Sequence, residues 1–126
     1  MKRLIYQVYT GKRSKLYDHC TESVSEYAKR IGAEHIVQRN PILRIAPDPF
    51  QTNRSRESYE KYGGFLPIYE KENAFSYLKS YDQIAIIDAD VYVRSERTES
   101  IFKAAGNNVD FSGVLERDMP CTSQYV

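Results

Sequence analysis

The longest apolar run in this chain, Ile84-Ala85-Ile86-Ile87, is followed directly by Asp88-Ala89-Asp90. Most of the run is β-branched, which is typical of a strand buried on both faces, as in a parallel sheet covered by helices. Side chains two apart on an extended chain point to the same side, about 7 Å from each other. We therefore expect Asp88 and Asp90 to face one point at the carboxyl end of this strand.

Two further strands and a long helix precede this run. The β-branched and aromatic residues Leu4–Tyr9 predict the first strand. From Ser14 to Gly32, apolar side chains recur at helical spacing and charged ones take the opposite face, so a helix capped by these two residues is expected. His35–Val37 predicts the second strand. The result is a β-α-β unit whose two strands should lie parallel in one sheet.

The rest of the chain alternates between helix and strand patterns. A proline-containing connection separates the β-α-β unit from the next helix. That helix should begin at Pro67 and carry Lys71 on one stripe with apolar neighbours. The predicted segments are a connection over Asn40–Asn53, a short helix over Ser55–Tyr62, a helix over Pro67–Ser80 with Ile68, Lys71, Phe75 and Leu78 on one stripe, a helix from Ser95 to Gly106, and a strand over Val109–Leu115.

This order predicts one α/β domain over residues 1–126, with a Rossmann-like, mostly parallel sheet flanked by helices. The 18 basic and 17 acidic residues leave a net charge of +1, which gives no electrostatic reason to expect nucleic acid or an anionic membrane as a partner. No apolar stretch approaches the ~18 residues that span a bilayer. Cys20 and Cys121 are far apart and lack metal-site spacing, which favours reduced thiols and a cytoplasmic location.

Paired carboxylates at the end of an apolar strand indicate a cation. Asp88 and Asp90 repel each other and resist desolvation unless a positive ion joins them. Oxygen ligands favour Mg²⁺ or Mn²⁺, and ligands of open α/β sheets bind beyond the carboxyl ends of the strands. The sequence therefore predicts a divalent metal site here. The alternative is a strand that ends in two solvated turn aspartates.

The segment Tyr81–Arg94 resembles the strand and Asp-x-Asp motif of the GT-A glycosyltransferases, and the lead-in Leu78–Asp82 is similar to their glycogenin-like branch. In that family the motif holds a divalent metal on the diphosphate of a nucleotide sugar. The resemblance implies a Mn²⁺ or Mg²⁺ cofactor and a nucleotide-sugar donor, with a UDP-sugar favoured. It implies these roles: Asp88 and Asp90 as metal ligands, Ala89 in the donor-binding motif, Lys71 on the donor phosphates, and Tyr9 and Thr10 on the nucleobase and ribose.

Each of these roles has a structural alternative. Lys71 can snorkel outward from its helix, Tyr9 can pack in the core, and Thr10 can open a turn. The basic residues Arg54, Arg56 and Lys61 could reach phosphates, but a solvated cluster is the simpler interpretation. His19 and His35 have no partners at ligand spacing and are expected to be structural.

The resemblance covers only the donor-binding half of the GT-A fold. No nucleophile or general base can be assigned, and we expect a chain that is incomplete at its carboxyl end and that self-associates through an exposed sheet edge. Two other functions remain open. One is a phosphotransferase of the haloacid-dehalogenase kind, although its Asp-x-Asp motif usually continues into Thr, where this chain has Val91-Tyr92-Val93. The other is a non-catalytic, truncated GT-A-like domain that self-associates and transfers no sugar.

Overall fold

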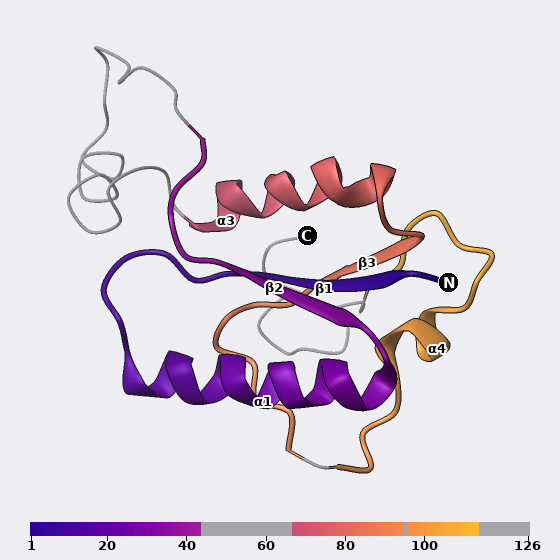
Figure 1. Ribbon diagram of the computed structural model, residues 1–126, viewed down its shortest axis with the longest axis horizontal. Coiled ribbons are helices and arrows are strands. Elements are labelled where there is room, and N and C mark those ends of the chain that lie inside the picture. The colour runs from indigo at the N-terminus through magenta and orange to yellow at the C-terminus, as the bar shows by residue number, and fades with distance from the viewer. Residues whose placement is uncertain (44–66, 95, 114–126) are drawn as a thin grey trace, which may run out of the picture.

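The computed structural model describes residues 1–43, 67–94 and 96–113. Its sheet contains the strands β1 (Arg3–Val8), β2 (Glu34–Gln38) and β3 (Gln83–Ile86). They pair in parallel in the order β2-β1-β3, with β1 in the centre (Figure 1). The predicted α/β class and the parallel pairing of the first two strands are confirmed.

Helices cover both faces of this sheet. Helix α1 (Lys15–Ile31) lies against one face. Helix α3 (Pro67–Glu70) continues directly into the 3₁₀-helix η1 (Lys71–Lys79) on the opposite face (Figure 1). The short helix α4 (Ile101–Ala105) packs with α1, because its Phe102 belongs to the cluster beneath that helix. The three layers thus enclose two apolar cores, one on each side of β1.

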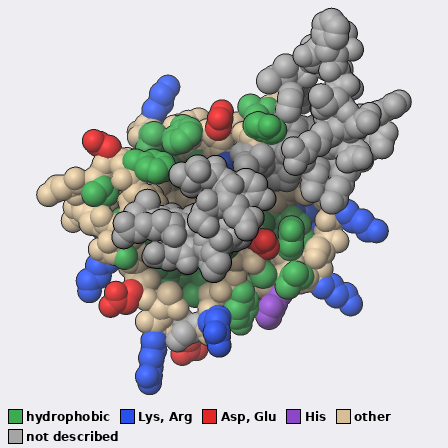
Figure 2. Space-filling view, turned by 180° about the vertical axis from the view of Figure 1, so that it is seen from behind, with side chains coloured by type: hydrophobic (Ala, Val, Ile, Leu, Met, Phe, Trp, Pro, Cys, Tyr) green, Lys and Arg blue, Asp and Glu red, His purple; other side chains and the backbone are tan. Residues whose placement is uncertain are grey.

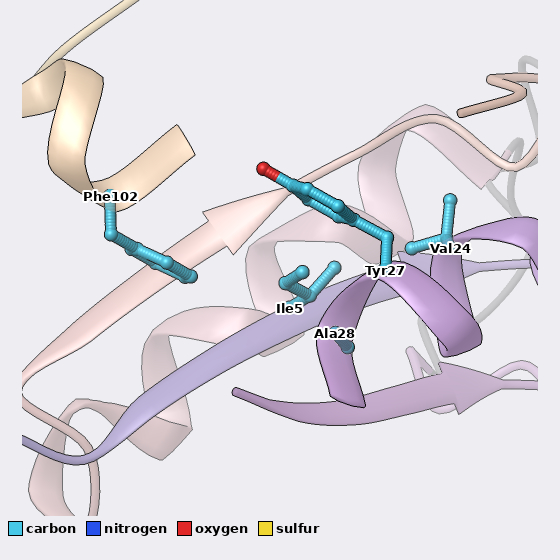
Figure 3. Close-up of a cluster of buried hydrophobic side chains, with 5 residues drawn as sticks. All are labelled: Ile5, Val24, Tyr27, Ala28 and Phe102. Atoms are coloured by element: carbon cyan, nitrogen blue, oxygen red, sulfur yellow. The ribbon is translucent and has the colours of Figure 1, made fainter. Parts of the chain in front are cut away.

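Alternate side chains of β1 supply both cores, as the pleat of a strand requires. Ile5 points toward α1 and packs with the cluster shown in Figure 3, which is Ile5, Val24, Tyr27, Ala28 and Phe102. Leu4, Tyr6 and Val8 point to the other side and pack with Ala74 of η1. Every residue from Leu4 to Thr10 is buried. β1 is therefore the most completely covered segment of the described structure.

Helix α1 ends where the sequence predicts, and Gly32 makes the stop possible. Gly32 has φ 74°, in the left-handed region that favours glycine, and the amide of Ala33 donates to the carbonyl of Ala28 at 2.9 Å. On the apolar stripe Cys20, Val24, Tyr27 and Ala28 are buried, while Leu16 is exposed. The pattern thus predicted the buried face except in the first turn.

The helix before β3 spans the predicted residues but has a different winding. A 3₁₀-helix has about three residues per turn, so residues three apart share a face. This spacing puts Lys71 in line with Ala74 and Tyr77, which contribute to the core, and leaves Phe75 and Leu78 exposed. The predicted stripe of Lys71 with Phe75 and Leu78 is therefore wrong.

β3 is less buried than its apolar sequence predicts. Gln83 to Ala85 are half-buried and Ile86 is exposed. The reason is the sheet order, because β3 is an edge strand and no described segment pairs with its outer side. The prediction of a strand buried on both faces is wrong.

The predicted fourth strand is absent from residues 109–113, and residues 114–115 lie outside the described ranges. Phe111 is 89% exposed. A groove of about 540 Å³ is lined both by β3 and by residues 109–113, so this segment lies beside the strand without pairing with it. A β-type sequence alone therefore does not form a strand here, because residues 109–113 make no ladder with β3.

α4 begins at Ile101 and not near Ser95, which is itself outside the described residues. Its N-cap is Ser100, whose side chain accepts from the amide of Lys103. The Tyr27 hydroxyl donates to the carbonyl of Glu99 at 2.6 Å and accepts from the amide of Ile101 at 2.8 Å. These two hydrogen bonds connect Glu99 and Ile101 to Tyr27 of α1, at the point where α4 begins.

Several predictions fall outside the described residues: most of the 40–53 connection, the helix over Ser55–Tyr62, the basic residues Arg54, Arg56 and Lys61, and Cys121. Cys20 is buried as a free thiol. Within residues 1–43, 67–94 and 96–113, no helix has the length and apolar character to cross a membrane. Seen from behind, charged side chains project around the rim of the molecule and hydrophobic patches are exposed between them (Figure 2).

Candidate functional site

The carboxyl ends of the parallel strands lie at one edge of the sheet, and the segments that follow them carry the predicted site residues. Tyr9 and Thr10 follow β1, and Asp88-Ala89-Asp90 comes two residues after β3. The β1–β3 pairing ends with the amide of Ile87 donating to the carbonyl of Tyr6 at 3.1 Å. This is the edge at which ligands of open α/β sheets bind.

The two aspartates lie in a turn and not on an extended strand. The amide of Val91 donates to the carbonyl of Asp88 at 3.2 Å, which closes a turn over Asp88–Val91. The pairing with β1 stops at Ile87, although β1 itself continues to Val8, and aspartate favours turns. The expected extended geometry at residues 88–90 is wrong. The backbone matches the alternative interpretation, in which the aspartates are part of a turn.

Asp88 forms an ion pair with Lys71, 17 residues earlier in the chain. The Asp88 side chain is 58% exposed and the Lys71 side chain 30% exposed. An ion pair this open to solvent contributes little to stability and exchanges readily. Lys71 reaches Asp88 because the 3₁₀ winding of η1 aligns it with Ala74, which is buried against the sheet.

Asp90 and Ala89 complete the turn and have opposite surroundings. Ala89 is buried, so its methyl group anchors the turn against the core. Asp90 is exposed and has no hydrogen-bond or ion-pair partner among the described residues. The turn thus presents two exposed carboxylates to solvent, of which only Asp88 has a partner within the described part of the chain.

Tyr9 is held in the structure by its own contacts. It is 3% exposed, its hydroxyl accepts from the amide of Ser14 at 2.7 Å, and that hydroxyl lies 2.9 Å from a carboxylate oxygen of Asp18. The guanidinium of Arg39 lies over its ring, 3.7 Å from the centroid. In this arrangement Tyr9 packs in the core, as its structural alternative predicts, and a nucleobase could reach the ring only after Arg39 moved away.

Among the described residues, the hydroxyl oxygen of Thr10 is the one buried side-chain polar atom without a hydrogen-bond partner. Its side chain is 6% exposed, and its hydroxyl oxygen makes no hydrogen bond within them. A buried hydroxyl without a partner costs about 1–3 kcal/mol. Such a group at the carboxyl edge of a parallel sheet is a feature that a polar ligand would satisfy.

Glu70, next to Lys71 in sequence, is the centre of a buried network that sequence analysis missed. It is 0% exposed, and its carboxylate accepts from the side chains of Gln38 at 2.8 Å and Asn73 at 2.6 Å. The amides of Ile42 and Leu43 also donate to it. Burial alone would raise the pKa of Glu70, but these hydrogen bonds outweigh it and hold the pKa below its usual value. The network joins the end of β2 to the start of η1.

A second missed group fixes the turn from within the sheet. Gln7, near the carboxyl end of the central strand β1, is 0% exposed. Its side-chain amide donates to the carbonyl of Asp88 at 3.1 Å, and its side-chain oxygen lies 2.7 Å from Nε2 of His35. Burial lowers the pKa of His35. A glutamine inside the apolar run Leu4–Tyr9 is the sequence signal that could have drawn attention to this contact.

The segment after the turn is attached to α1. The amide of Val93 donates to the Ser23 hydroxyl at 3.0 Å, and the rings of His19 and Tyr92 stack with centroids 5.0 Å apart. His19 and His35 therefore both contact protein groups, in agreement with the structural role expected for them. The turn is held on both sides and is not a free loop.

The carboxylates at the turn fit a hard divalent cation whose other ligands are water or substrate oxygens. Asp88 and Asp90 both offer exposed carboxylate oxygens, which suit Mg²⁺ or Mn²⁺. Within the described residues, no three or more His, Cys, Asp or Glu side chains gather as a ready metal site. An ion here would therefore complete its shell with water or with substrate phosphates, which is the usual behaviour of Mg²⁺.

One groove of the described structure lies away from these residues. The groove of about 540 Å³ beside β3 is lined mainly by apolar side chains from η1, β3 and α4, and none of the candidate residues lines it. No family model, curated protein or solved structure matches this chain. The functional assignment therefore depends on the site itself.

Proposed function

We propose that this chain binds a nucleotide-diphosphate sugar together with a divalent cation, as the donor-binding part of a metal-dependent glycosyltransferase. The observation that carries the proposal is the exposed Lys71–Asp88 ion pair beside Asp90, which is exposed and has no partner among the residues that the structure describes. It brings a cation and two carboxylates to the edge of a parallel sheet, and a metal diphosphate carries both complementary charges.

The ion pair supports this proposal because both of its members would keep a partner when a metal diphosphate binds. Asp88 would exchange the ammonium of Lys71 for the metal, and Asp90 would supply a second carboxylate. Lys71, once released, would contact the phosphates. The exchange costs little, because the existing pair is open to solvent and weak.

The remaining candidate residues have supporting roles in the proposal. Thr10 would satisfy its unpartnered hydroxyl on the donor, and the small side chain of Ala89 would keep the turn close to the core. The metal, when bound, supplies charge neutralisation for the departing nucleoside diphosphate. Mn²⁺ or Mg²⁺ is the expected cofactor, and a UDP-sugar is the favoured donor. The described residues assign no acceptor site and no general base.

A ligand-induced shift in melting temperature tests this function. A ligand at 100 times its dissociation constant stabilises a protein by about 2.7 kcal/mol, which raises the melting temperature by several degrees. We expect this rise with Mn²⁺ and UDP together, and a much smaller one with Mn²⁺ alone or UDP alone.

Matched variants separate the site from the general surface. Asp88→Asn and Asp90→Asn should abolish the rise, and Lys71→Met should weaken it. Glu72→Gln and Lys79→Met change an exposed carboxylate and an exposed ammonium of the same helix and should leave it unchanged. An equal rise for Asp88→Asn and wild type would exclude the proposed site. Hydrolysis of a simple phosphate ester would instead favour the phosphotransferase alternative.

A further inference from the structure

The carbonyl of Asp88 is the point where the turn joins the interior of the sheet. It accepts two hydrogen bonds, one from the amide of Val91 across the turn and one from the side chain of Gln7. The Val91 bond is local and closes the turn. The Gln7 bond is the one that ties the turn to the central strand.

Gln7 is well suited to hold a fixed position. It lies in the middle strand, it is fully buried, and it pairs with Val37 of β2, directly after the last residue of β1 in register with β3. The Asp88 carbonyl can only accept, so the group that faces it must be the side-chain NH₂ of Gln7. The oxygen of Gln7 then faces Nε2 of His35, which must carry a proton to donate at 2.7 Å.

We propose that Gln7 is a positioning residue for the metal site: it is oriented by His35 and holds the Asp88 carbonyl, and so sets the turn that presents Asp88 and Asp90. This inference rests on the proposed metal-diphosphate function for its consequence in binding. The contacts His35–Gln7–Asp88 connect β2, the central strand β1 and the turn that follows β3.

The physical reason is that, among the described residues, the Asp88 carbonyl has no hydrogen-bond donor outside its own turn except Gln7. Strand pairing stops at Ile87, and the side chains of Asp88 and Asp90 are exposed. Without Gln7, the Asp88 carbonyl would keep only the bond within its own turn. Hydrogen-bond partners behind metal ligands commonly change metal affinity by about 10–100-fold when they are removed, because they orient the ligands.

Gln7→Met tests this directly, because methionine has a similar length and no donor. We expect Gln7→Met to weaken the binding of Mn²⁺ in the presence of UDP by about tenfold or more. Water proton relaxation measures this binding. The Val91 amide should also exchange its hydrogen faster, which NMR detects without any ligand.

Variants at Ile5 and His35 distinguish a positioning role of Gln7 from a general loss of stability. Ile5→Val removes a core methyl group from the same strand and the same face, without touching Asp88, and should change neither Mn²⁺ binding nor exchange at Val91. His35→Phe removes the donor to Gln7 and should weaken Mn²⁺ binding in the same direction. His35→Gln can still donate to Gln7 and should restore it.

The outcomes separate this inference from the proposed function. If wild type binds Mn²⁺ and UDP, and Gln7→Met and His35→Phe bind them equally well with unchanged exchange at Val91, the positioning role is excluded and the proposed function stands. If wild type binds neither, the proposed function fails and the positioning role fails with it. Should Gln7→Met not fold, the pair His35→Phe and His35→Gln decides the matter.

Discussion

Two carboxylates of this molecule have opposite surroundings, although one of them, Glu70, directly precedes the lysine that contacts the other, Asp88. Glu70 is 0% exposed and accepts hydrogen bonds from two side chains and two backbone amides. The Asp88 side chain is 58% exposed and has the ammonium of Lys71 as its partner. Glu70 is held by neutral donors in the interior, whereas Asp88 is held by one cation at the surface.

The difference indicates which carboxylate can change its partner. Removing a partner from a buried and satisfied carboxylate costs the desolvation of everything left behind. An exposed ion pair contributes little, so its members can be separated cheaply. Glu70 is therefore suited to hold the chain together, and Asp88 with Asp90 is suited to bind something that arrives from solution.

The largest expected effect comes from Glu70→Ala. This change leaves four donors without their acceptor, and we expect it to lower the free energy of unfolding by about 3 kcal/mol, measured by urea denaturation. Glu72→Ala is the matched control, because Glu72 is an exposed carboxylate two residues away, and it should change the free energy by less than about 0.5 kcal/mol. Similar losses in both variants would contradict the contrast.

Tyr6 extends the buried network and makes it sensitive to alkali. Its hydroxyl donates to the side chain of Gln38, and burial, with the nearby Tyr77 and Glu70, raises its pKa from 10.0 to about 12. Between pH 10 and about 12, the Tyr6 hydroxyl therefore keeps its proton in the folded state but has lost it in the unfolded state. The contribution to stability is therefore complete below pH 10 and is lost as the pH rises toward 12, by about 2–3 kcal/mol.

Chemical denaturation of wild type and Tyr6→Phe across this alkaline range measures that contribution. The variant should be less stable than wild type near neutral pH, because it lacks the hydrogen bond to Gln38. The gap between the two should close as the pH rises through the raised pKa. A constant gap would show that Tyr6 does not titrate with folding.

Acid acts on the same network through Glu70. Its pKa in the folded state lies below the usual 4.5, so the unfolded state takes up a proton first as the pH falls. The stability that Glu70 contributes is present above that usual value and is lost below it. Glu70→Gln should show a smaller loss on acidification than wild type in thermal melts at a series of pH values, and an equal loss would contradict the role of Glu70.

The smallest effect on stability is expected at the turn. Asp88→Asn and Asp90→Asn should each change the free energy of unfolding by less than about 0.5 kcal/mol, because the side chains are exposed and one has a single weak partner. Denaturation without added metal measures this. A large loss would show that these aspartates hold the fold and would weaken their assignment as ligands.

The elements with strong local patterns could be predicted from the sequence. β1, α1 and β2 have clear periodicity and turn residues at their ends, and Gly32 ends α1 as expected. Asp88 and Asp90 could be proposed because a strand followed by two aspartates is a local signal, whereas Lys71 was proposed from the family resemblance. What they do in solution stays a prediction.

The features that were missed depend on partners far apart in the chain. Gln38 at the end of β2 donates a hydrogen bond to Glu70 at the end of α3, and nothing in the sequence near either residue indicates this contact. The turn at Asp88 depends on Gln7 in the first strand and on the end of pairing at Ile87. The 3₁₀ winding of η1 is likewise set by packing, because its sequence fits an α-helical stripe equally well.

The central place of β1 has a consequence for synthesis on the ribosome. Tyr6 pairs with Ile36 on one edge and with Ile86 on the other. Because chains emerge from their amino terminus, the β1-α1-β2 unit can assemble first, while the second edge of β1 stays open until β3 has been made. Until η1 has also been made, the apolar side chains of β1 that later face it, Leu4, Tyr6 and Val8, are exposed to solvent in the nascent chain.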